Sequence, residues 1–263
     1  MTLPAPNAAF HWSREPWGHA LRCRPLGACA QHLFTSRQLQ LPAEDSWQAA
    51  LASVEATPRR LLRVKQVHGR AIRVLARGQV PGDASDHRPD ADAIVSNEPG
   101  LALAVMVADC VPILLCDPVR GAVAAVHAGW RGTCARVVHA AVESLVTCCG
   151  CEPAHLVAAI GPSVGPRDYE VGDSLIDAFR AAGHSEAHIS RWFIRTDRKL
   201  RLDLWSANIQ QLIDGGVDAN RISLCGLSTV AHPGIFDSYR VDGPRAGRMA
   251  AIIVVPEATH APA

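Results

Sequence analysis

Four apolar runs follow one another in the middle of the chain, separated by turn residues: Ala93–Ser96, Leu101–Val107, Val111–Cys116 and Ala122–Val126. Apolar and polar side chains hardly alternate within them, which indicates strands covered on both faces. Earlier, Leu61–Val67 and Ala71–Leu75 do alternate, and they predict a strand pair around Gly69. Further strands are predicted at Leu156–Ile160, Arg221–Cys225 and Met249–Val254.

Between the later strands, apolar residues recur at the spacing of a helix. The predicted helices cover Cys134–Cys148, Asp173–Ala182 and Leu204–Ile213. Thr133 and Asp203 stand where a capping side chain is favoured, and Gly150 follows the first helix as a stop. Strands interleaved with helices predict an α/β fold in which mixed β-sheets are layered with helices.

The pattern of apolar positions is weaker in the first sixty residues and is interrupted at residues 78–90. Residues 1 to about 60 show little periodicity, so residues 1–30 are interpreted as an N-terminal extension and residues 31–257 as a single α/β catalytic domain. Residues 78–90 have the composition of a loop. No Pro/Ser-rich linker divides the chain after Leu61, which argues for one continuous domain.

Composition and charge exclude several classes of protein. With 48% hydrophobic and 19% charged residues the chain is globular rather than disordered. The formal charge of +1 offers no basic surface for nucleic acid or an anionic membrane. No apolar stretch is long enough to cross a bilayer, and no secretory signal is visible. Nine irregularly spaced cysteines then indicate reduced thiols in a cytoplasmic protein.

Three potential metal ligands stand at ends of predicted strands. His68 lies in Val-Lys-Gln-Val-His-Gly, Cys110 in Val-Ala-Asp-Cys-Val-Pro, and His127 in Val-His-Ala-Gly-Trp-Arg-Gly. One thiolate and two imidazoles leave the fourth tetrahedral position of zinc open, as catalytic zinc sites do. Water bound there would titrate near neutrality and become a nucleophile.

The same residues permit other interpretations. Cys110 and His127 alone form a thiolate–imidazole pair that needs no metal. In a purely structural interpretation, Cys110 packs in the core while His68 and His127 satisfy hydrogen bonds at strand ends. A structural role is favoured for the histidines in or beside helices, which are His139, His155, His184 and His188.

Several blocks in fixed order closely resemble the laccase-domain family, whose members have been called polyphenol oxidases, peptidoglycan editing factors and purine nucleoside phosphorylases. Beside the three segments above, the matching blocks are Ala91–Val95, Ala159–Ser163, Tyr169–Gly172, Asp203–Leu204 with Asn208, Cys225, Ser238–Arg240 and Gly247–Ala250. The resemblance spans roughly residues 30 to 255. It implies zinc, rather than copper, on His68, Cys110 and His127, and a fold similar to the cytotoxic necrotizing factor deamidases. The family's paired glycines after Phe-Thr-Thr-Arg are absent after Arg37, which bears on substrate range.

The resemblance implies a zinc-dependent purine nucleoside phosphorylase acting on adenosine, inosine, guanosine and methylthioadenosine, with adenosine deaminase activity. Purine nucleoside and phosphate are then its partners, and Arg131, Tyr239 and Arg240 its substrate-binding residues. Arg131 is the first choice for phosphate because a guanidinium matches phosphate oxygens. The alternative is a cysteine hydrolase editing a peptidoglycan precursor, with Cys110 as nucleophile and His127 as base; only the metal site needs His68. A multicopper oxidase is disfavoured because the chain has no His-x-His pair.

Overall fold

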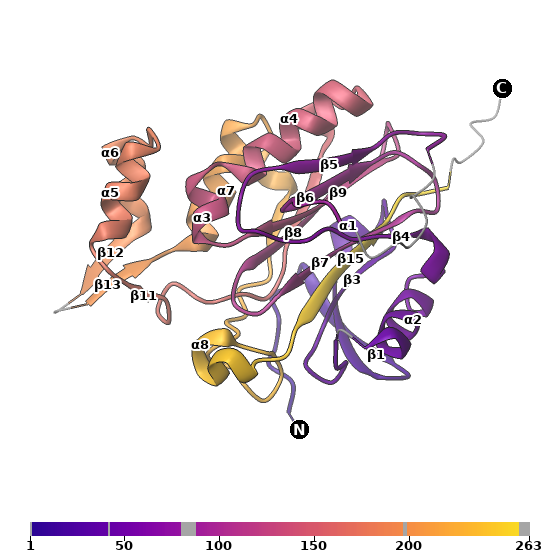
Figure 1. Cartoon of the computed structure of the whole chain (residues 1–263), viewed down its shortest axis with the longest axis horizontal. Helices are drawn as coiled ribbons and strands as arrows, with labels where there is room; N and C mark the ends of the chain where they lie inside the picture. The colour runs from indigo at the N-terminus through magenta and orange to yellow at the C-terminus, as the bar shows by residue number, and fades with distance from the viewer. Residues whose placement is uncertain (1, 42, 80–87, 197–198, 258–263) are drawn as a thin grey trace.

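Two six-stranded sheets lie face to face in the computed structural model, which describes residues 2–41, 43–79, 88–196 and 199–257 (Figure 1). In spatial order, the first contains β1 (Phe10–Glu15), β2 (Gly18–Cys23), β3 (His32–Thr35), β15 (Met249–Val254), β7 (Ala102–Val107) and β4 (Leu61–Leu62). The second contains β14 (Ile222–Leu224), β10 (Val157–Ile160), β8 (Val111–Asp117), β9 (Ala122–Ala128), β6 (Ala93–Ser96) and β5 (Ile72–Leu75). Both sheets mix parallel and antiparallel pairs.

Helices cover the outer faces of this pair of sheets. Helix α2 (Glu44–Ala52) packs on the first sheet, and α4 (Val137–Cys149) and α7 (Leu204–Asp214) pack on the second. A side unit carries α5 (Ser174–Ala181), α6 (Glu186–Trp192) and a small sheet of β11 (Glu170–Val171), β13 (Lys199–Leu202) and β12 (Phe193–Thr196). The helices are α1 (Arg24–Gly27), α2 (Glu44–Ala52), α3 (Trp130–Cys134), α4 (Val137–Cys149), α5 (Ser174–Ala181), α6 (Glu186–Trp192), α7 (Leu204–Asp214) and α8 (Tyr239–Asp242), with short 3₁₀ turns at Pro58–Arg60, Pro153–His155, Ala219–Arg221 and Gly243–Arg245.

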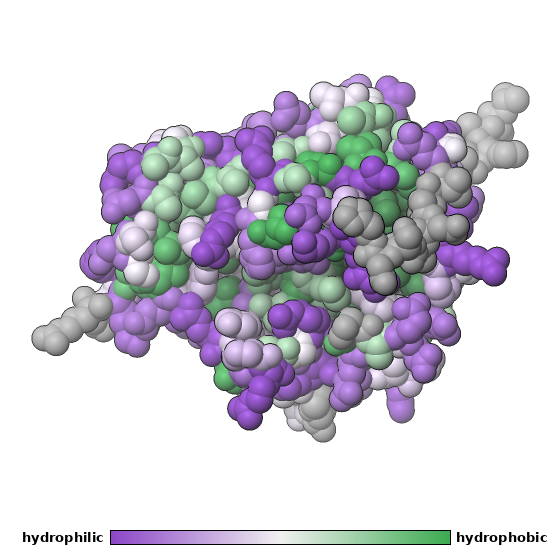
Figure 2. All heavy atoms as spheres, viewed as in Figure 1, coloured by the Kyte–Doolittle hydropathy of each residue, from purple (hydrophilic) through white to green (hydrophobic). Residues whose placement is uncertain are grey.

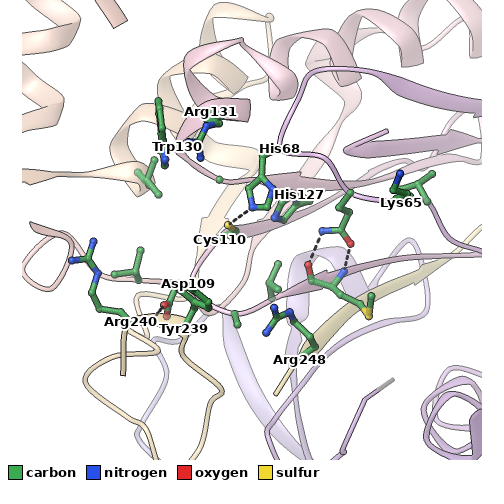
Figure 3. Close-up of a pocket in the computed structure, with 18 of the residues that line it drawn as sticks. Lys65, His68, Asp109, Cys110, His127, Trp130, Arg131, Tyr239, Arg240 and Arg248 are labelled. Atoms are coloured by element: carbon green, nitrogen blue, oxygen red, sulfur yellow. Dashed lines mark hydrogen bonds between the residues drawn. The ribbon is translucent and has the colours of Figure 1, made fainter. Parts of the chain in front are cut away.

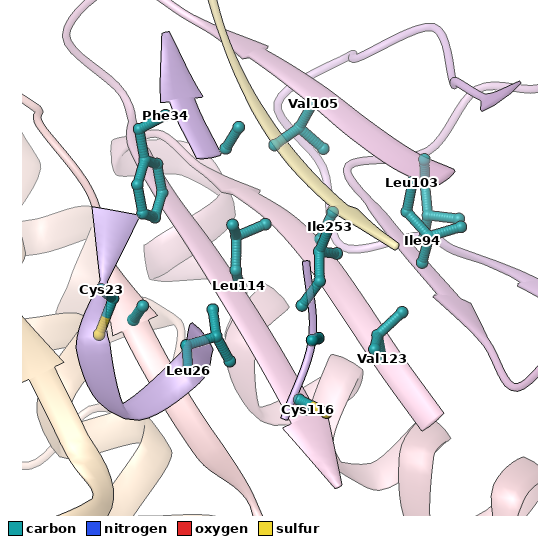
Figure 4. Close-up of a cluster of buried hydrophobic side chains, with 14 of the residues drawn as sticks. Cys23, Leu26, Phe34, Ile94, Leu103, Val105, Leu114, Cys116, Val123 and Ile253 are labelled. Carbon is teal, nitrogen blue, oxygen red and sulfur yellow. The ribbon is translucent and has the colours of Figure 1, made fainter. Parts of the chain in front are cut away.

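Burial on both faces explains the apolar strands. Along β8, Leu114 and Cys116 point into the core between the two sheets, while Ile113 and Leu115 point into the core beneath α4 and α7. Because side chains alternate between faces, a strand with apolar neighbours on both sides has no position for a polar residue. Figure 4 shows the core between the sheets, where Val105 of β7 and Leu114 of β8 contribute from opposite layers. The predicted coverage of both faces is confirmed.

The predicted strand pair around Gly69 is wrong. The two segments belong to different sheets, β4 pairing with β7 and β5 with β6. Between them, the carboxylate of Asp92 accepts hydrogen bonds from the backbone N–H groups of His68 and Gly69 at 2.9 and 2.6 Å. These donors therefore bind a side chain instead of a neighbouring strand.

The first predicted helix is interrupted near its start. Arg136 adopts a left-handed conformation with φ of 61° and separates α3 from α4. Thr133 lies inside α3 rather than at a cap, and its hydroxyl bonds the buried Asn208 side chain of α7 at 3.3 Å. The stop at Gly150 and the cap at Asp203 are confirmed, since Gly150 is left-handed and Asp203 accepts the Ser206 N–H.

The first thirty residues belong to the folded unit. Strands β1 and β2 form a hairpin at the edge of the first sheet, and Leu21 and Leu26 are buried in the core between the sheets. The core is therefore continuous across the boundary expected at residue 30, and the single α/β domain is confirmed.

The likeness to cytotoxic necrotizing factor deamidases stays a prediction. Of the loop expected at residues 78–90, residues 80–87 lie outside the described part of the chain.

Candidate active site

His68, Cys110 and His127 come together where β7 ends, β8 begins and β9 ends. Their potential ligand atoms all lie within 4.8 Å of one another, and Cys110 Sγ is 3.8 Å from His68 Nε2 (Figure 3). The two imidazole rings meet edge to face, with centroids 4.8 Å apart. The three side chains differ in exposure to solvent: His68 is exposed, Cys110 is half-buried and His127 is buried. The group therefore opens to solvent on the His68 side.

A buried carboxylate holds two of these residues in place. Asp92 Oδ1 lies 2.8 Å from His127 Nδ1 and accepts the His68 N–H, while Oδ2 accepts the N–H of Gly69. The bond at Nδ1 leaves Nε2 of His127 to face the site. The hydrogen bond from the His68 N–H to Asp92 stabilises His68 in a left-handed conformation, φ 60°, that a non-glycine residue rarely adopts. Burial alone would raise the pKa of the Asp92 carboxyl, but these hydrogen bonds lower it below its usual range.

Cys110 is placed by the turn between β7 and β8. Asp109 in this turn has φ of 82°, and its side chain accepts hydrogen bonds from Thr229 Oγ1 and the Arg240 N–H, both at 2.6 Å. The Asp109 carboxylate therefore attaches α8 to the turn. Across the β8–β9 pair, Val111 is opposite Ala128, so Cys110 is opposite Gly129.

Gly129 leaves the room that the three side chains need. A Cβ atom at this position would lie 2.8 Å from Cys110 Sγ and 3.0 Å from His68 Cδ2. We expect Gly129→Ala to displace at least one potential ligand and to lower the affinity for zinc about tenfold or more, as measured by competition with a chromophoric chelator. Gly234→Ala, whose Cβ would meet nothing within 4 Å, is the control. Wild-type zinc affinity in Gly129→Ala would contradict this expectation.

The ionisation of Cys110 and His127 is coupled. Burial disfavours the Cys110 thiolate, but the adjacent His127 and His68 outweigh it and lower the thiol pKa to about 6. Burial likewise opposes the charged form of His127, and the Cys110 thiolate with Asp92 raises its pKa to about 9. Without a bound ion, the pair is therefore thiolate and imidazolium at neutral pH, and the thiolate is the form that binds metals or attacks carbon.

A cavity of about 1070 Å³ opens beside this group. It lies between the helical layer and α8, where the space-filling view is hollowed, with apolar residues visible inside and hydrophilic residues around the rim (Figure 2). The predicted substrate-binding residues Arg131, Tyr239 and Arg240 all line it. Trp130 and Tyr169 line it as well, so aromatic and cationic side chains are both available to a ligand.

One family model covers most of the chain. The model described as "Multi-copper polyphenol oxidoreductase laccase" matches residues 41–256. The chain belongs to this family.

Two solved structures share the fold of this laccase-family chain. The chain is similar to the hypothetical protein YfiH of Bacillus licheniformis, with a TM-score of 0.84 at 25% identity over 94% of this chain and 99% of that one. It is also similar to YlmD from Geobacillus stearothermophilus, with a TM-score of 0.83 at 28% identity and the same coverage of both chains.

Curated relatives carry the name of one activity. A protein of Deinococcus radiodurans named purine nucleoside phosphorylase is 39% identical over 194 residues, which are 74% of this chain and 70% of that protein. A Pseudomonas aeruginosa protein of the same name is 34% identical over 263 residues, covering 92% of this chain and 97% of its own. The relatives thus support an enzyme.

Two of the histidines outside the site make local contacts within the fold. His184 Nε2 lies 2.8 Å from the Cys134 carbonyl oxygen, and His155 Nε2 lies 3.7 Å from Glu152 Oε2.

All nine cysteines are free thiols without a disulfide partner. Within the described ranges, every helix is too short or too polar to cross a lipid bilayer.

Asp92 is the residue against the His–Cys–His group that sequence reasoning missed. It belonged to a block of the family resemblance but had no role assigned. A charged residue directly before a strand as apolar as β6 was the available signal, since a buried carboxylate requires several hydrogen-bond donors.

Proposed function

We propose that the chain is a zinc-dependent purine nucleoside phosphorylase of the cytoplasm that also deaminates adenosine. The convergence of His68, Cys110 and His127 beside a cavity with aromatic and cationic walls carries the proposal. The curated names of the relatives supply the reaction and the substrate class. Adenosine, inosine, guanosine and methylthioadenosine all present the purine and ribose that such a cavity accommodates.

The donor set fits zinc. Metal–ligand bonds near 2.0–2.3 Å place tetrahedral ligand atoms about 3.3–3.8 Å apart. Cys110 Sγ lies 3.8 Å from His68 Nε2, and all three ligand atoms lie within 4.8 Å of one another, so a small inward shift of the side chains completes the set. A thiolate with two imidazoles suits zinc and leaves one coordination position free, and a multicopper cluster would need more histidines than this group provides. Bound zinc would supply Lewis-acid chemistry at the open position.

The residues of the chain bind and orient the substrates. Trp130, Tyr169 and Tyr239 offer aromatic surfaces to the purine, and Arg131 and Arg240 offer charge. In phosphorolysis a phosphate oxygen forms a bond to the anomeric carbon as the bond to the purine nitrogen breaks, and the base leaves with the electron pair and gains a proton. In deamination, water adds to the purine carbon and ammonia leaves. The cavity favours both by holding the reactants close together.

Adenosine turnover by the purified chain tests this proposal. Protein purified without chelator is analysed for metal and incubated with adenosine, with and without phosphate. We expect about one zinc per chain, and adenine and ribose 1-phosphate only when phosphate is present. Inosine should accumulate without phosphate and be cleaved further to hypoxanthine when phosphate is present. Unchanged adenosine under all conditions, with zinc bound, would refute the proposal.

One observation favours a second candidate, the cysteine hydrolase acting on a peptidoglycan precursor. Cys110, His127 and Asp92 form a thiolate–imidazolium–carboxylate series, with the His127 ring oriented by a 2.8 Å contact to Asp92. In this alternative Cys110 attacks an amide carbonyl and His127 gives a proton to the leaving amine. His68 has no part in that reaction, which makes it the discriminating residue.

A further inference from the structure

The cavity has two sides of different chemistry. One side carries the aromatic residues Trp130 and Tyr169, and Lys65 and Arg248 line the cavity toward the other. Lys65 pairs with Asp90 at 3.2 Å, but both side chains are exposed, so this ion pair is weak and an anion in the cavity can compete for the ammonium group. Figure 3 shows Arg131 and Arg240 on one side of Cys110, with Lys65 and Arg248 toward the other.

The arginines on the aromatic side are already engaged. The guanidinium of Arg131 lies 4.3 Å from the centre of the Trp130 ring, and that of Arg240 lies 5.0 Å from the Tyr169 ring. Arg240 also donates to the Glu170 carbonyl at 2.9 Å. Both side chains are exposed, so water screens their charge. Together with the rings they form a flat surface suited to a heteroaromatic base.

Arg248 differs from both. It is half-buried, and its Nη1 donates to the carbonyls of Ala246 and Gly247 at 2.9 and 2.8 Å, which fixes the side chain. No salt bridge to it occurs within the described residues; nearby Asp237 pairs with Arg37. A partly buried guanidinium without a carboxylate partner can still accept an anion, and its planar nitrogens match phosphate oxygens.

The register places this cation next to the reacting centre. Met249 of β15 is opposite Val107 of β7, so Arg248 is opposite Ala108, two residues before Cys110. On the other edge of β7, the Gln66 side chain exchanges two hydrogen bonds with the Met106 backbone, at 2.7 and 2.8 Å. Lys65 and Arg248 therefore flank the end of β7 from both sides.

We propose that Arg248, assisted by Lys65, forms the subsite for inorganic phosphate, while the Trp130 and Tyr169 side receives the purine. This inference rests on the proposed phosphorolysis. Displacement at the anomeric carbon requires the entering oxygen and the leaving nitrogen on opposite faces. Phosphate at Arg248 and base at the aromatic surface satisfy that requirement across the His–Cys–His group. The purine leaves with the electron pair and takes a proton, and phosphate becomes the ribose 1-phosphate ester.

Matched charge removals test the assignment in the zinc-loaded full-length enzyme. For Arg248→Met we expect the KM for phosphate to rise about 10- to 100-fold, with the KM for adenosine changed less than about threefold, because a charged hydrogen-bond partner is lost only for phosphate. Arg131→Met should instead raise the KM for adenosine. Arg245→Met, exposed and outside the cavity lining, should change neither.

Phosphate binding gives a second measurement that does not depend on turnover. Inorganic phosphate should raise the melting temperature of wild-type protein and of Arg131→Met, and should fail to do so in Arg248→Met. If Arg248→Met does not fold, Arg248→Lys serves instead, with a smaller rise in the KM for phosphate. A phosphate defect confined to Arg131→Met would overturn the assignment. Wild-type protein that binds phosphate without cleaving adenosine would refute the proposed function and leave the subsite standing.

Discussion

Replacing His68 by Ala is expected to abolish adenosine cleavage as completely as Cys110→Ala does, with a loss of more than about 100-fold and a parallel loss of bound zinc. The reason is that three ligands hold the ion together, so removing one changes both its affinity and its geometry. His68 is exposed, and its side chain supports little of the core. Loss of activity in a folded His68→Ala protein would therefore report on the site. Metal content by mass spectrometry and the initial rate with phosphate are the measurements.

The hydrolase alternative predicts another pattern for the same variants. His68→Ala would keep most of its amide-cleaving activity, and alkylation of Cys110 would remove that activity without loss of metal. His155→Ala is the matched control, since this histidine lies outside the cavity lining and its ring forms a weak pair with the exposed Glu152. An active, metal-free His68→Ala protein would decide against the zinc enzyme.

The middle of the fold was predictable because burial there is simple. The strands from β6 to β9 lie between two cores, so nearly every side chain is apolar and the runs appear directly in the sequence. The β8–β9 hairpin even brings Cys110 and His127 together, since Pro112 pairs with His127. Those two residues could thus be associated from the pattern of strands alone.

The position of His68 could not be obtained in that way. It depends on a side chain, Asp92, that binds the backbone of a distant turn and holds it in a left-handed conformation. Periodicity contains no information about such a contact. The hairpin of β1 and β2 escaped for a related reason, since polar residues such as Arg14 and Arg22 interrupt its apolar pattern at the sheet edge. His68 entered the predicted ligand set as a histidine at the end of a predicted strand and through the family motifs, and neither observation fixes its position in space.

Asp92→Asn is expected to weaken zinc binding about 10- to 100-fold and to lower the free energy of unfolding by about 2–4 kcal/mol. Each carboxylate oxygen faces N–H donors, with Oδ1 near His127 Nδ1 and the His68 N–H, and Oδ2 near the Gly69 N–H. An amide presents a donor where one oxygen stood. In either orientation at least one backbone N–H then loses its acceptor, and a buried unpaired donor is costly.

The two effects are separated by the conditions of measurement. Unfolding by urea in excess chelator reports the stability of the metal-free protein, so the contribution of bound zinc does not enter. Zinc affinity is then measured below the unfolding transition by competition with a chelator. Asp177→Asn is the control, because this carboxylate is exposed and pairs with the exposed Arg180. If Asp92→Asn bound zinc as tightly as the wild type, His68 and His127 would hold their positions without the carboxylate, and the positioning role of Asp92 would be refuted.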